Sequence, residues 1–393
     1  MSDHSLASGP LVFAPMRARS PQEGHRVATP LELFFDLVFV VAIAQAAAGF
    51  HHSISEAHIA DGLVTYLMAF FGIWWAWMNF TWFASAYDCD DVPYRLAVFA
   101  QITGALVFAA GISSMFSVRS LNVAIIGGYV IMRLAQVTQW LRAARSDPER
   151  SPATLRYAIG IAVLQVLWIG LAQLPAAWIQ PGFLVLIVLE MAVPAWAEAT
   201  VQTTWHPHHI AERYALFTII VLGESILSAT VAVQTALASG ERFAALAPVI
   251  CGGLLIVFGM WWLYFYRPFR APHEHRTRLD FLWGYGHYVV FASSAAVGAG
   301  LAAAVDDVTH KAHISHVAAG AAVAIPVALY VLSLSLLHYS PSMMLSLALS
   351  VIAAVLVLLS PLAFGSGAIV ATGLILAALL AFKIARYHRS SHA

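Results

Sequence analysis

The sequence predicts an all-α polytopic membrane protein with about twelve transmembrane helices. Of its 393 residues, 61% are hydrophobic and only 10% are charged, and the mean hydropathy is +0.78. Soluble domains average roughly 25% charged residues, so this composition is typical of chains that are largely embedded in lipid. The spacing of the apolar runs and the distribution of Lys and Arg support the same fold class.

Apolar runs of roughly 18 to 25 residues, bounded by charged residues, Pro or Gly, define the predicted spans. They lie at residues 30–49, 62–84, 94–116, 121–142, 153–172, 182–200, 210–236, 244–266, 279–303, 314–337, 342–362 and 366–386. Pro194 is expected to kink the sixth span.

The basic residues alternate between the two sides that this topology defines. With a cytoplasmic N-terminus, sixteen Lys and Arg residues fall on the inner side and three, Arg119, Arg242 and Lys311, on the outer side. Membrane proteins concentrate Lys and Arg in cytoplasmic loops, so both termini are predicted to be cytoplasmic. The expected location is the bacterial inner membrane, and the expected partner is the lipid bilayer.

A short internal repeat divides the chain into two predicted halves. Residues 71–77 read Phe-Gly-Ile-Trp-Trp-Ala-Trp, and residues 258–264 read Phe-Gly-Met-Trp-Trp-Leu-Tyr, an offset of 187 residues. Six spans separate the copies, so the two halves would have the same orientation and a pseudo-twofold axis along the membrane normal. The predicted parts are a cytoplasmic tail at 1–28, six-helix halves at 29–204 and 205–388, and a cytoplasmic tail at 389–393.

Two acidic residues, Asp36 and Glu224, lie within apolar spans and are the first candidates for a functional site. The repeat aligns them with an offset of 188 residues, which would place them on opposite sides of an interface between the halves. A carboxyl group at such a depth is costly unless it is compensated, and it suits a proton or cation site. Glu32, one turn before Asp36, is nearer the predicted cytoplasmic end and has easier access to water. The alternative for these acids is a purely structural role.

Arg133 is the one basic residue that the predicted topology places deep in a span. It shares a helical face with Tyr129 and Gln136, a polar stripe that must point away from lipid. Arg133 is expected either to form an ion pair with Asp36 or Glu32, or to bind an anionic substrate through its guanidinium group.

His287, in the ninth predicted span, suits a proton relay because a histidine can change charge near physiological pH. A neutral histidine bonded to a facing helix is the alternative. The seventeen histidines of the chain also raise the question of a metal site. No Cys or paired-carboxylate spacing supports one, so neither a metal nor another cofactor is predicted.

Three segments resemble the bacterial low temperature requirement protein A (LtrA) family. They are Thr29–Val40 (TPLELFFDLVFV), His209–Tyr214 (HIAERY) followed by Ile220–Ser225 (IVLGES), and Tyr285–His287 (YGH). Tyr214 departs from the glycine more often found there, and the chain after Tyr288 is divergent. The resemblance implies a multi-span inner-membrane protein connected with growth in the cold, and it implies no substrate or reaction.

The resemblance draws attention to His209, Glu212 and Arg213 at the start of the seventh span. We expect this segment to form a cytoplasmic gate. The alternative is a helix cap, because charged residues at helix ends commonly complement the backbone dipole.

Together these features favour a secondary transporter or proton-coupled permease for an unidentified small molecule or ion. In this interpretation Asp36 and Glu224 are the protonatable pair, Arg133 is their counter-charge or anion clamp, and His287 is a relay. A cation channel, an intramembrane lipid-handling enzyme and a sensor remain alternatives. No nucleophile, phosphate-loop or dinucleotide motif occurs in a suitable context, so no catalytic residue is assigned. The zero net charge gives no reason to expect a nucleic-acid partner.

Overall fold

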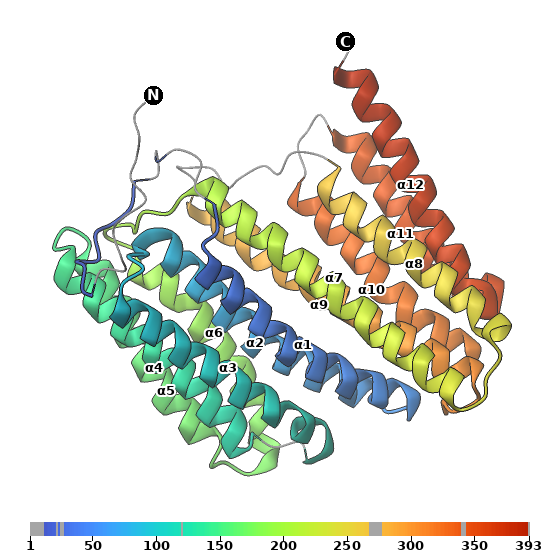
Figure 1. The fold of residues 1–393 in the computed structure, drawn as a ribbon, viewed down its shortest axis with the longest axis horizontal. Helices are drawn as coiled ribbons and strands as arrows, with labels where there is room; N and C mark the ends of the chain where they lie inside the picture. Colours follow the sequence, from blue (N-terminus) through green and yellow to red (C-terminus); the bar gives the residue numbers. More distant parts are fainter. Residues whose placement is uncertain are drawn as a thin grey trace. The chain divides into compact units, whose positions relative to one another are not determined.

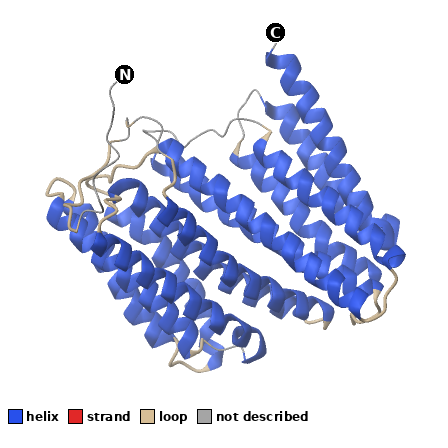
Figure 2. Cartoon of the chain, viewed as in Figure 1, coloured by secondary structure: helices blue, strands red, loops and turns tan. Residues whose placement is uncertain are grey.

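The computed structural model describes residues 12–20, 23, 27–118, 121–266, 277–338 and 343–391. Within these ranges the side chains at 118, 277–281 and 388–391 are not described. The described chain is built from α-helices joined by short loops, with no strand in these ranges (Figures 1 and 2). The prediction of an all-α fold is therefore confirmed.

The helices follow one another in the order predicted from the apolar runs. They are α1 (Pro30–Ser55), α2 (Ile59–Tyr87), α3 (Val92–Val118), α4 (Val123–Ser146), α5 (Ser151–Leu171), α6 (Ile179–Ala197), α7 (Pro207–Ala238), α8 (Phe243–Phe265), α9 (Thr277–Val308), α10 (His316–Leu337), α11 (Met344–Phe364) and α12 (Ala368–Ser391), with short 3-10 turns at Ala176–Trp178 and Gly365–Gly367.

Ten stretches of the described chain are long and apolar enough to cross a membrane. The last of them, Met344–Tyr387, contains both α11 and α12. The stretch α4 is not among the ten, and it carries Arg133, Arg142 and Arg145 within a single helix. The polytopic membrane architecture is confirmed, while the predicted repeat of six plus six helices stays a prediction.

The chain folds into two compact units that interleave along the sequence. Unit 1 comprises residues 1–42 and 72–213, and unit 2 comprises residues 43–71 and 214–393. Helices α1, α2 and α7 each contribute one part to unit 1 and the other part to unit 2.

In unit 1, helices α3, α4, α5 and α6 pack in chain order, each against the next (Figure 1). Helices α3 and α4 approach each other closely, because glycine residues lie where the two helices cross. A Cβ atom added to Gly128 would lie 2.3 Å from the backbone N of Phe108, and one added to Gly104 would lie 2.7 Å from the carbonyl of Gly128. Glycine at these positions lets two backbones touch, as is common between helices in membranes.

In unit 2, α9 packs against α10, and α10, α11, α12 and α8 follow as successive neighbours. Helix α9 is buried along most of its length. Its Gly300 faces the backbone of α10, where an added Cβ would lie 2.3 Å from the carbonyl of Ala322. The first part of α2 also belongs to this unit, and the Tyr66 hydroxyl donates to the carbonyl of Ala292 at 2.6 Å.

The described part of the N-terminal tail packs on unit 1. Met16 is fully buried, and the Ala14 N–H donates to Asp91 Oδ2 at 2.7 Å. Arg142 donates to both carboxylate oxygens of Asp91 and to the Ala14 carbonyl. Burial alone would raise the pKa of Asp91, but these donors and the Tyr94 N–H hold it below its ordinary value.

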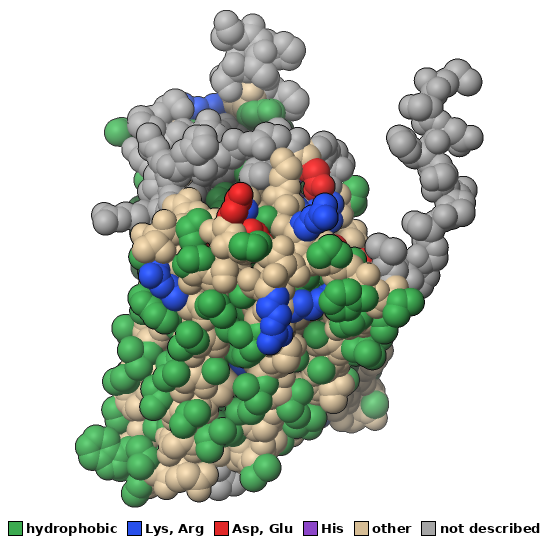
Figure 3. Space-filling view, turned by 90° about the vertical axis from the view of Figure 1, so that its left-hand side faces the viewer, with side chains coloured by type: hydrophobic (Ala, Val, Ile, Leu, Met, Phe, Trp, Pro, Cys, Tyr) green, Lys and Arg blue, Asp and Glu red, His purple; other side chains and the backbone are tan. Residues whose placement is uncertain are grey.

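Large apolar side chains cover much of the outer surface. One face of the molecule carries hydrophobic side chains over its lower part, with the charged side chains gathered toward the upper part (Figure 3). Helices α5 and α6 alone expose Ile159, Val163, Val166, Leu184, Val185 and Val188. A continuous apolar surface of this kind fits contact with lipid chains.

Candidate functional site

The first predicted site residue, Glu32, lies in the opening turn of α1. Thr29 N–H donates to Glu32 Oε2 at 2.8 Å, and Glu32 N–H donates to Thr29 Oγ1 at 3.2 Å, which is a reciprocal capping box. Pro30 occupies the first helical position, where its missing N–H is not needed. Glu32 is only 1% exposed, so the expectation that it reaches water easily is wrong.

Asp36 lies one turn further along α1 and is completely buried. It receives two parallel hydrogen bonds from Arg213, from Nη2 to Oδ1 at 2.6 Å and from Nε to Oδ2 at 3.0 Å. The indole N–H of Trp77 adds a third, at 2.7 Å to Oδ1. A bidentate guanidinium contact is the strongest way in which a side chain can hold a carboxylate.

His209 and Arg213 are four residues apart on α7 and face the two acids of α1, which are also four residues apart. Arg213 Nη1 lies 3.0 Å from Glu32 Oε1, and His209 Nε2 lies 3.2 Å from the same oxygen. Side chains separated by four residues occupy one helix face, so the two acids of α1 lie opposite the two basic residues of α7. Since the lower-numbered residues pair with each other, this part of α1 runs parallel to the start of α7.

These residues form what we call the carboxylate–arginine cluster: Glu32, Asp36, Trp77, His209 and Arg213, all in unit 1. The two acids, the histidine and the arginine are each 1% exposed or less. With a neutral imidazole, the four ionisable groups together carry one net negative charge. A single added proton brings that sum to zero. The cluster can therefore exist in two forms that differ by one proton, one with a net negative charge and one that is neutral.

Arg133 does not pair with Asp36 or Glu32, which corrects the sequence-based expectation. Its Nη2 donates to Glu190 Oε2 on α6 at 2.9 Å, and its Nη1 donates to Gln136 at 2.9 Å. Arg213 supplies the positive charge for the two acids of α1 instead. The chain therefore contains two separate buried ion-pair systems in unit 1.

Glu190 is the centre of the second system and is fully buried. Besides Arg133, it accepts hydrogen bonds from the indoles of Trp75 and Trp168 at 2.9 and 3.1 Å and from the Tyr129 hydroxyl at 3.0 Å. These donors come from α2, α4 and α5, so one carboxylate ties three helices to α6. A carboxylate saturated in this way is a structural anchor.

Glu224 lies in the unit 2 part of α7 and is 3% exposed. Its Oε1 accepts a hydrogen bond from the Ser228 hydroxyl at 2.7 Å, one turn away, as the helical spacing predicts. No described group bonds to its Oε2. The neighbouring Ser225 donates to the carbonyls of Val221 and Ser294 rather than to the acid. Glu224 is thus a buried carboxyl group with one neutral hydroxyl partner.

His287 is fully buried in α9 of unit 2 among aromatic rings. Its Nδ1 lies 2.8 Å from the Trp283 carbonyl, which requires a proton on Nδ1, and its Nε2 lies 3.4 Å from the Tyr264 hydroxyl. The rings of Trp283 and Tyr214 lie 4.4 and 4.9 Å from the imidazole. His287 is therefore hydrogen-bonded within unit 2. Its role as a proton relay stays a prediction.

Glu212, the remaining residue of the predicted gate, is half-buried beside Arg213. Within the described part of the chain no group hydrogen-bonds its Oε2. Of the predicted gate segment, His209 and Arg213 therefore belong to the cluster, and Glu212 is not one of its members.

Two histidines near the ends of helices, His51 in α1 and His316 in α10, pair with carboxylates. His51 Nε2 lies 2.7 Å from Asp306 Oδ2, and His316 Nδ1 lies 2.7 Å from Asp307 Oδ2. Among the residues that the structure describes, no three His, Cys, Asp or Glu side chains converge as metal ligands would.

Sequence reasoning missed two features of these sites. Glu190 is an acid within an apolar span, yet nothing in the sequence shows which donors it meets, because tryptophans such as Trp75 and Trp168 commonly serve packing in membrane helices. Trp77 likewise gave no signal as a carboxylate donor. Tryptophan in a membrane span has one buried N–H that must find an acceptor, and this requirement was the available clue.

Fold and sites together define the class: a polytopic α-helical membrane protein with charged clusters sealed between its helices. The family model for the bacterial low temperature requirement A protein (LtrA) matches residues 27–384. The chain therefore belongs to the LtrA family, and the resemblance seen in its motifs is confirmed.

A curated relative is the uncharacterized protein RA0937 of Rhizobium meliloti (strain 1021), which is 28% identical over 280 residues. The aligned region covers 65% of this chain and 64% of that protein. The chain thus matches less than two thirds of the length of its relative.

Proposed function

We propose that this LtrA-family protein is a proton-coupled secondary transporter of the bacterial inner membrane, with both termini cytoplasmic. The observation that carries the proposal is the carboxylate–arginine cluster, in which two carboxylates share one guanidinium group inside an apolar bundle and one of them, Glu32, also faces an imidazole. Its substrate is a small molecule or ion.

Net charge is costly inside the membrane-embedded part of a protein. A charged side chain at the centre of a bilayer costs about 2.5–3.5 kcal/mol on insertion scales. The neutral, once-protonated form of the cluster is therefore favoured while the site is closed to water. Opening the site to water removes much of that penalty, so the proton can leave. A proton equilibrium that depends on access is the property that couples proton movement to transport.

Glu224 supports the same function. A buried carboxyl with one hydroxyl partner lacks the counter-charge that would hold it ionised in place. It is accordingly the second protonatable group of the proposal, with His287 as a relay in unit 2. The joint action of these groups with Asp36 stays a prediction. Arg133 keeps no role as a counter-charge for Asp36, since it serves Glu190.

The test is proton flux in proteoliposomes that enclose a pH-sensitive dye. The parent is compared with Asp36→Asn and Glu224→Gln, and with Asp90→Asn as a control, because Asp90 is an exposed acid that pairs with Arg95. We expect gradient-driven flux in the parent and the control, and its loss in both site variants at equal amounts of folded protein. Flux that persists in both site variants, or no flux in the parent under any gradient, would refute the proposal.

A further inference from the structure

An apolar groove lies in unit 2 between the start of α2, the middle of α9 and the first half of α10, beside the last turns of α1. Its volume is about 330 Å³. An apolar cavity of about 150 Å³ already stays dry and holds a molecule of the size of benzene, so this groove has room for a larger apolar ligand. No residue of its lining is charged, and none belongs to the carboxylate–arginine cluster.

The three hydroxyl groups of the lining all donate to backbone carbonyls. Tyr66 on α2 donates to Ala292 on α9 at 2.6 Å, and Tyr288 on α9 donates back to Leu67 on α2 at 2.8 Å. Ser293 donates within its own helix at 2.6 Å. The groove therefore offers no hydroxyl proton to a polar ligand, and its lining suits an apolar one.

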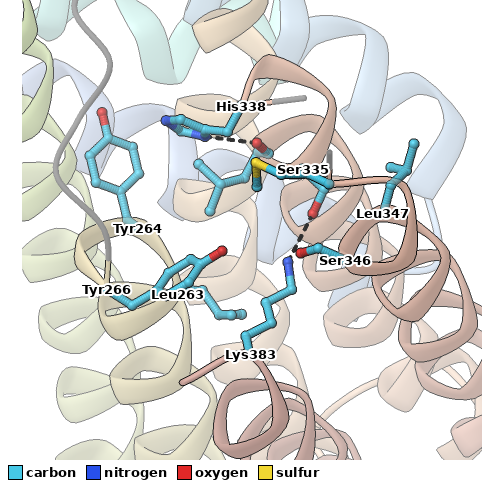
Figure 4. Close-up of a pocket in the computed structure, with 10 residues that line it drawn as sticks. Leu263, Tyr264, Tyr266, Ser335, His338, Ser346, Leu347 and Lys383 are labelled. Carbon is cyan, nitrogen blue, oxygen red and sulfur yellow. Dashed lines mark hydrogen bonds between the residues drawn. The ribbon is translucent and has the colours of Figure 1, made fainter. Parts of the chain in front are cut away.

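A second, smaller cavity of unit 2 shows the difference. It lies at the other end of α10 and has a volume of about 80 Å³, and on its wall the Lys383 amine donates to Ser335 at 3.4 Å (Figure 4). Its lining also includes Tyr264, His338 and Ser346. Polar side chains gather in that cavity, whereas the groove is lined almost entirely by hydrocarbon.

The groove follows the helices over the depth of one lipid leaflet. Its lining residues recur at helical spacing from Ala318 to Leu329 on α10 and from Ile59 to Leu67 on α2. At 1.5 Å per residue, these stretches extend about 16 and 12 Å along the two helices. The hydrocarbon core of a bilayer is about 30 Å thick, so one leaflet supplies about 15 Å. A single extended acyl chain matches this length.

The inner part of the groove is buried and its rim is exposed. Tyr66 and Ala292 are at most 5% exposed, whereas Leu63, Ile325 and Leu329 on the rim are 41%, 50% and 47% exposed. Alanine side chains leave the space between these larger ones; they are Ala292, Ala296, Ala318, Ala321 and Ala322. A chain can therefore enter from the side of the helices.

The groove begins at helix ends that carry polar pairs. Ala318 lies in the first turn of α10, where His316 pairs with Asp307, and His51 in the last turns of α1 pairs with Asp306. Ionisable side chains are costly in the bilayer core, so this end belongs at the level of the lipid headgroups. The groove thus runs from the headgroup level toward the middle of the membrane.

We propose that this groove binds one acyl chain of a phospholipid in the leaflet on the predicted outer side. Lipid chains are as apolar as leucine, so the chain binds by packing rather than by leaving water. It fills space between the helices in which the lining atoms would otherwise lack contacts. This site is independent of the proposed transport of protons.

The experiment is photo-crosslinking of the purified full-length protein in dodecyl maltoside. The probe is a phosphatidylethanolamine with a diazirine group midway along one acyl chain, and mass spectrometry identifies the labelled peptides as the mole fraction of probe in the micelle is raised. The variants are Ala321→Phe and Ala318→Phe, which add a ring inside the groove. The control is Ala378→Phe, which adds the same ring at an exposed position of α12.

We expect labelling of the groove to saturate at a lower probe fraction than labelling around Ala378, and excess unlabelled phosphatidylethanolamine should suppress it. Ala321→Phe should reduce groove labelling severalfold, and Ala378→Phe should leave it unchanged. Groove labelling that rises in proportion to the probe, as ordinary lipid contact does, would overturn the proposal.

Two further outcomes also count against the acyl chain. Unchanged groove labelling in Ala321→Phe contradicts the site, and suppression by hexadecane but not by unlabelled phospholipid assigns the groove to a different apolar molecule. If Ala321→Phe does not fold, Ala318→Phe must reduce the labelling severalfold, and unchanged labelling there is equally contradictory.

Discussion

At the scale of single residues, specific hydrogen-bond donors offset the free-energy cost of burying a carboxylate. Asp36 receives a bidentate arginine and an indole N–H, and Glu190 receives an arginine, two indoles and a phenol. Arginine suits such places because it stays charged and its planar fork matches a carboxylate. Tryptophan suits them because it adds a donor to a side chain that is otherwise apolar.

Arg213→Gln should lower the stability of the protein severely, because it leaves two buried carboxylates without their guanidinium. Removing one partner of a buried ion pair costs about 3–5 kcal/mol. The measurement is thermal unfolding in detergent, with Arg95→Gln as the matched control, since Arg95 and Asp90 form a pair that is 43% and 48% exposed. Exposed pairs contribute about 0–1 kcal/mol.

The double variant Asp36→Asn with Arg213→Gln should recover part of that loss, because only one buried carboxylate, Glu32, is then left without the guanidinium instead of two. If Arg213→Gln were no more destabilising than Arg95→Gln, the cluster would not be the buried ion pair described here.

Cys89, in the loop between α2 and α3, should react slowly with maleimide at neutral pH. Burial raises the pKa of its thiol to about 11, so the reactive thiolate is scarce until the pH is raised well above neutrality. The measurement is the labelling rate against pH in a Cys251→Ala background. Labelling that is already fast at neutral pH in the folded protein, as fast as after denaturation, would contradict the burial of this thiol.

The sequence identified most members of the cluster but assigned one partner wrongly. A carboxyl group in an apolar helix is visible from its neighbours, so Glu32, Asp36 and Glu224 could be found. Helical spacing tells which residues share a face, yet it does not tell which helix lies opposite. Arg133 was therefore paired with the wrong acid, and Arg213 was read as a gate or cap.

At the scale of helices, close packing depends on where small residues fall. Gly128→Ala should destabilise the contact between α3 and α4, because its methyl group would meet backbone atoms that cannot move aside. Overpacking of this kind costs about 1–3 kcal/mol.

The adjacent Gly127→Ala is the control, since an added Cβ there meets nothing within 4 Å. It should be neutral or stabilising by about 0.5–1 kcal/mol, as alanine is the better helix former. Equal unfolding midpoints for the two variants would contradict the observed helix contact.

Helix positions were well predicted because a bilayer imposes a length on each apolar run. Their ends were predicted less well: α1 continues to Ser55 and α9 to Val308, beyond the predicted limits of 49 and 303. In those places the helix continues into polar residues, such as His51 and Asp306, that bond to one another. Hydropathy marks where a helix leaves an apolar environment and cannot mark where it stops.

At the scale of the whole molecule, the interleaving of the two compact units was beyond the reach of the sequence. Residues 43–71 group with the second part of the chain, although they precede most of the first. Such grouping depends on contacts between helices far apart in sequence, which neither hydropathy nor a seven-residue repeat reports.

The distribution of basic residues predicts that both termini are cytoplasmic. Green fluorescent protein fused after residue 393 should fluoresce in bacteria, and alkaline phosphatase fused at the same place should be inactive. Active phosphatase fused after Lys311, in the predicted outer loop between α9 and α10, serves as the control. The opposite pattern at the C-terminus would require a different number of membrane spans.

The central claim is that the carboxylate–arginine cluster takes up and releases one proton. Infrared difference spectroscopy of the purified protein between about pH 5 and pH 8 measures this directly. We predict a change in a carboxyl or imidazole band that is altered in Asp36→Asn, Glu32→Gln or His209→Gln and unaltered in Asp90→Asn. A spectrum that is the same at both pH values, or a change that persists in all three cluster variants, would contradict the claim.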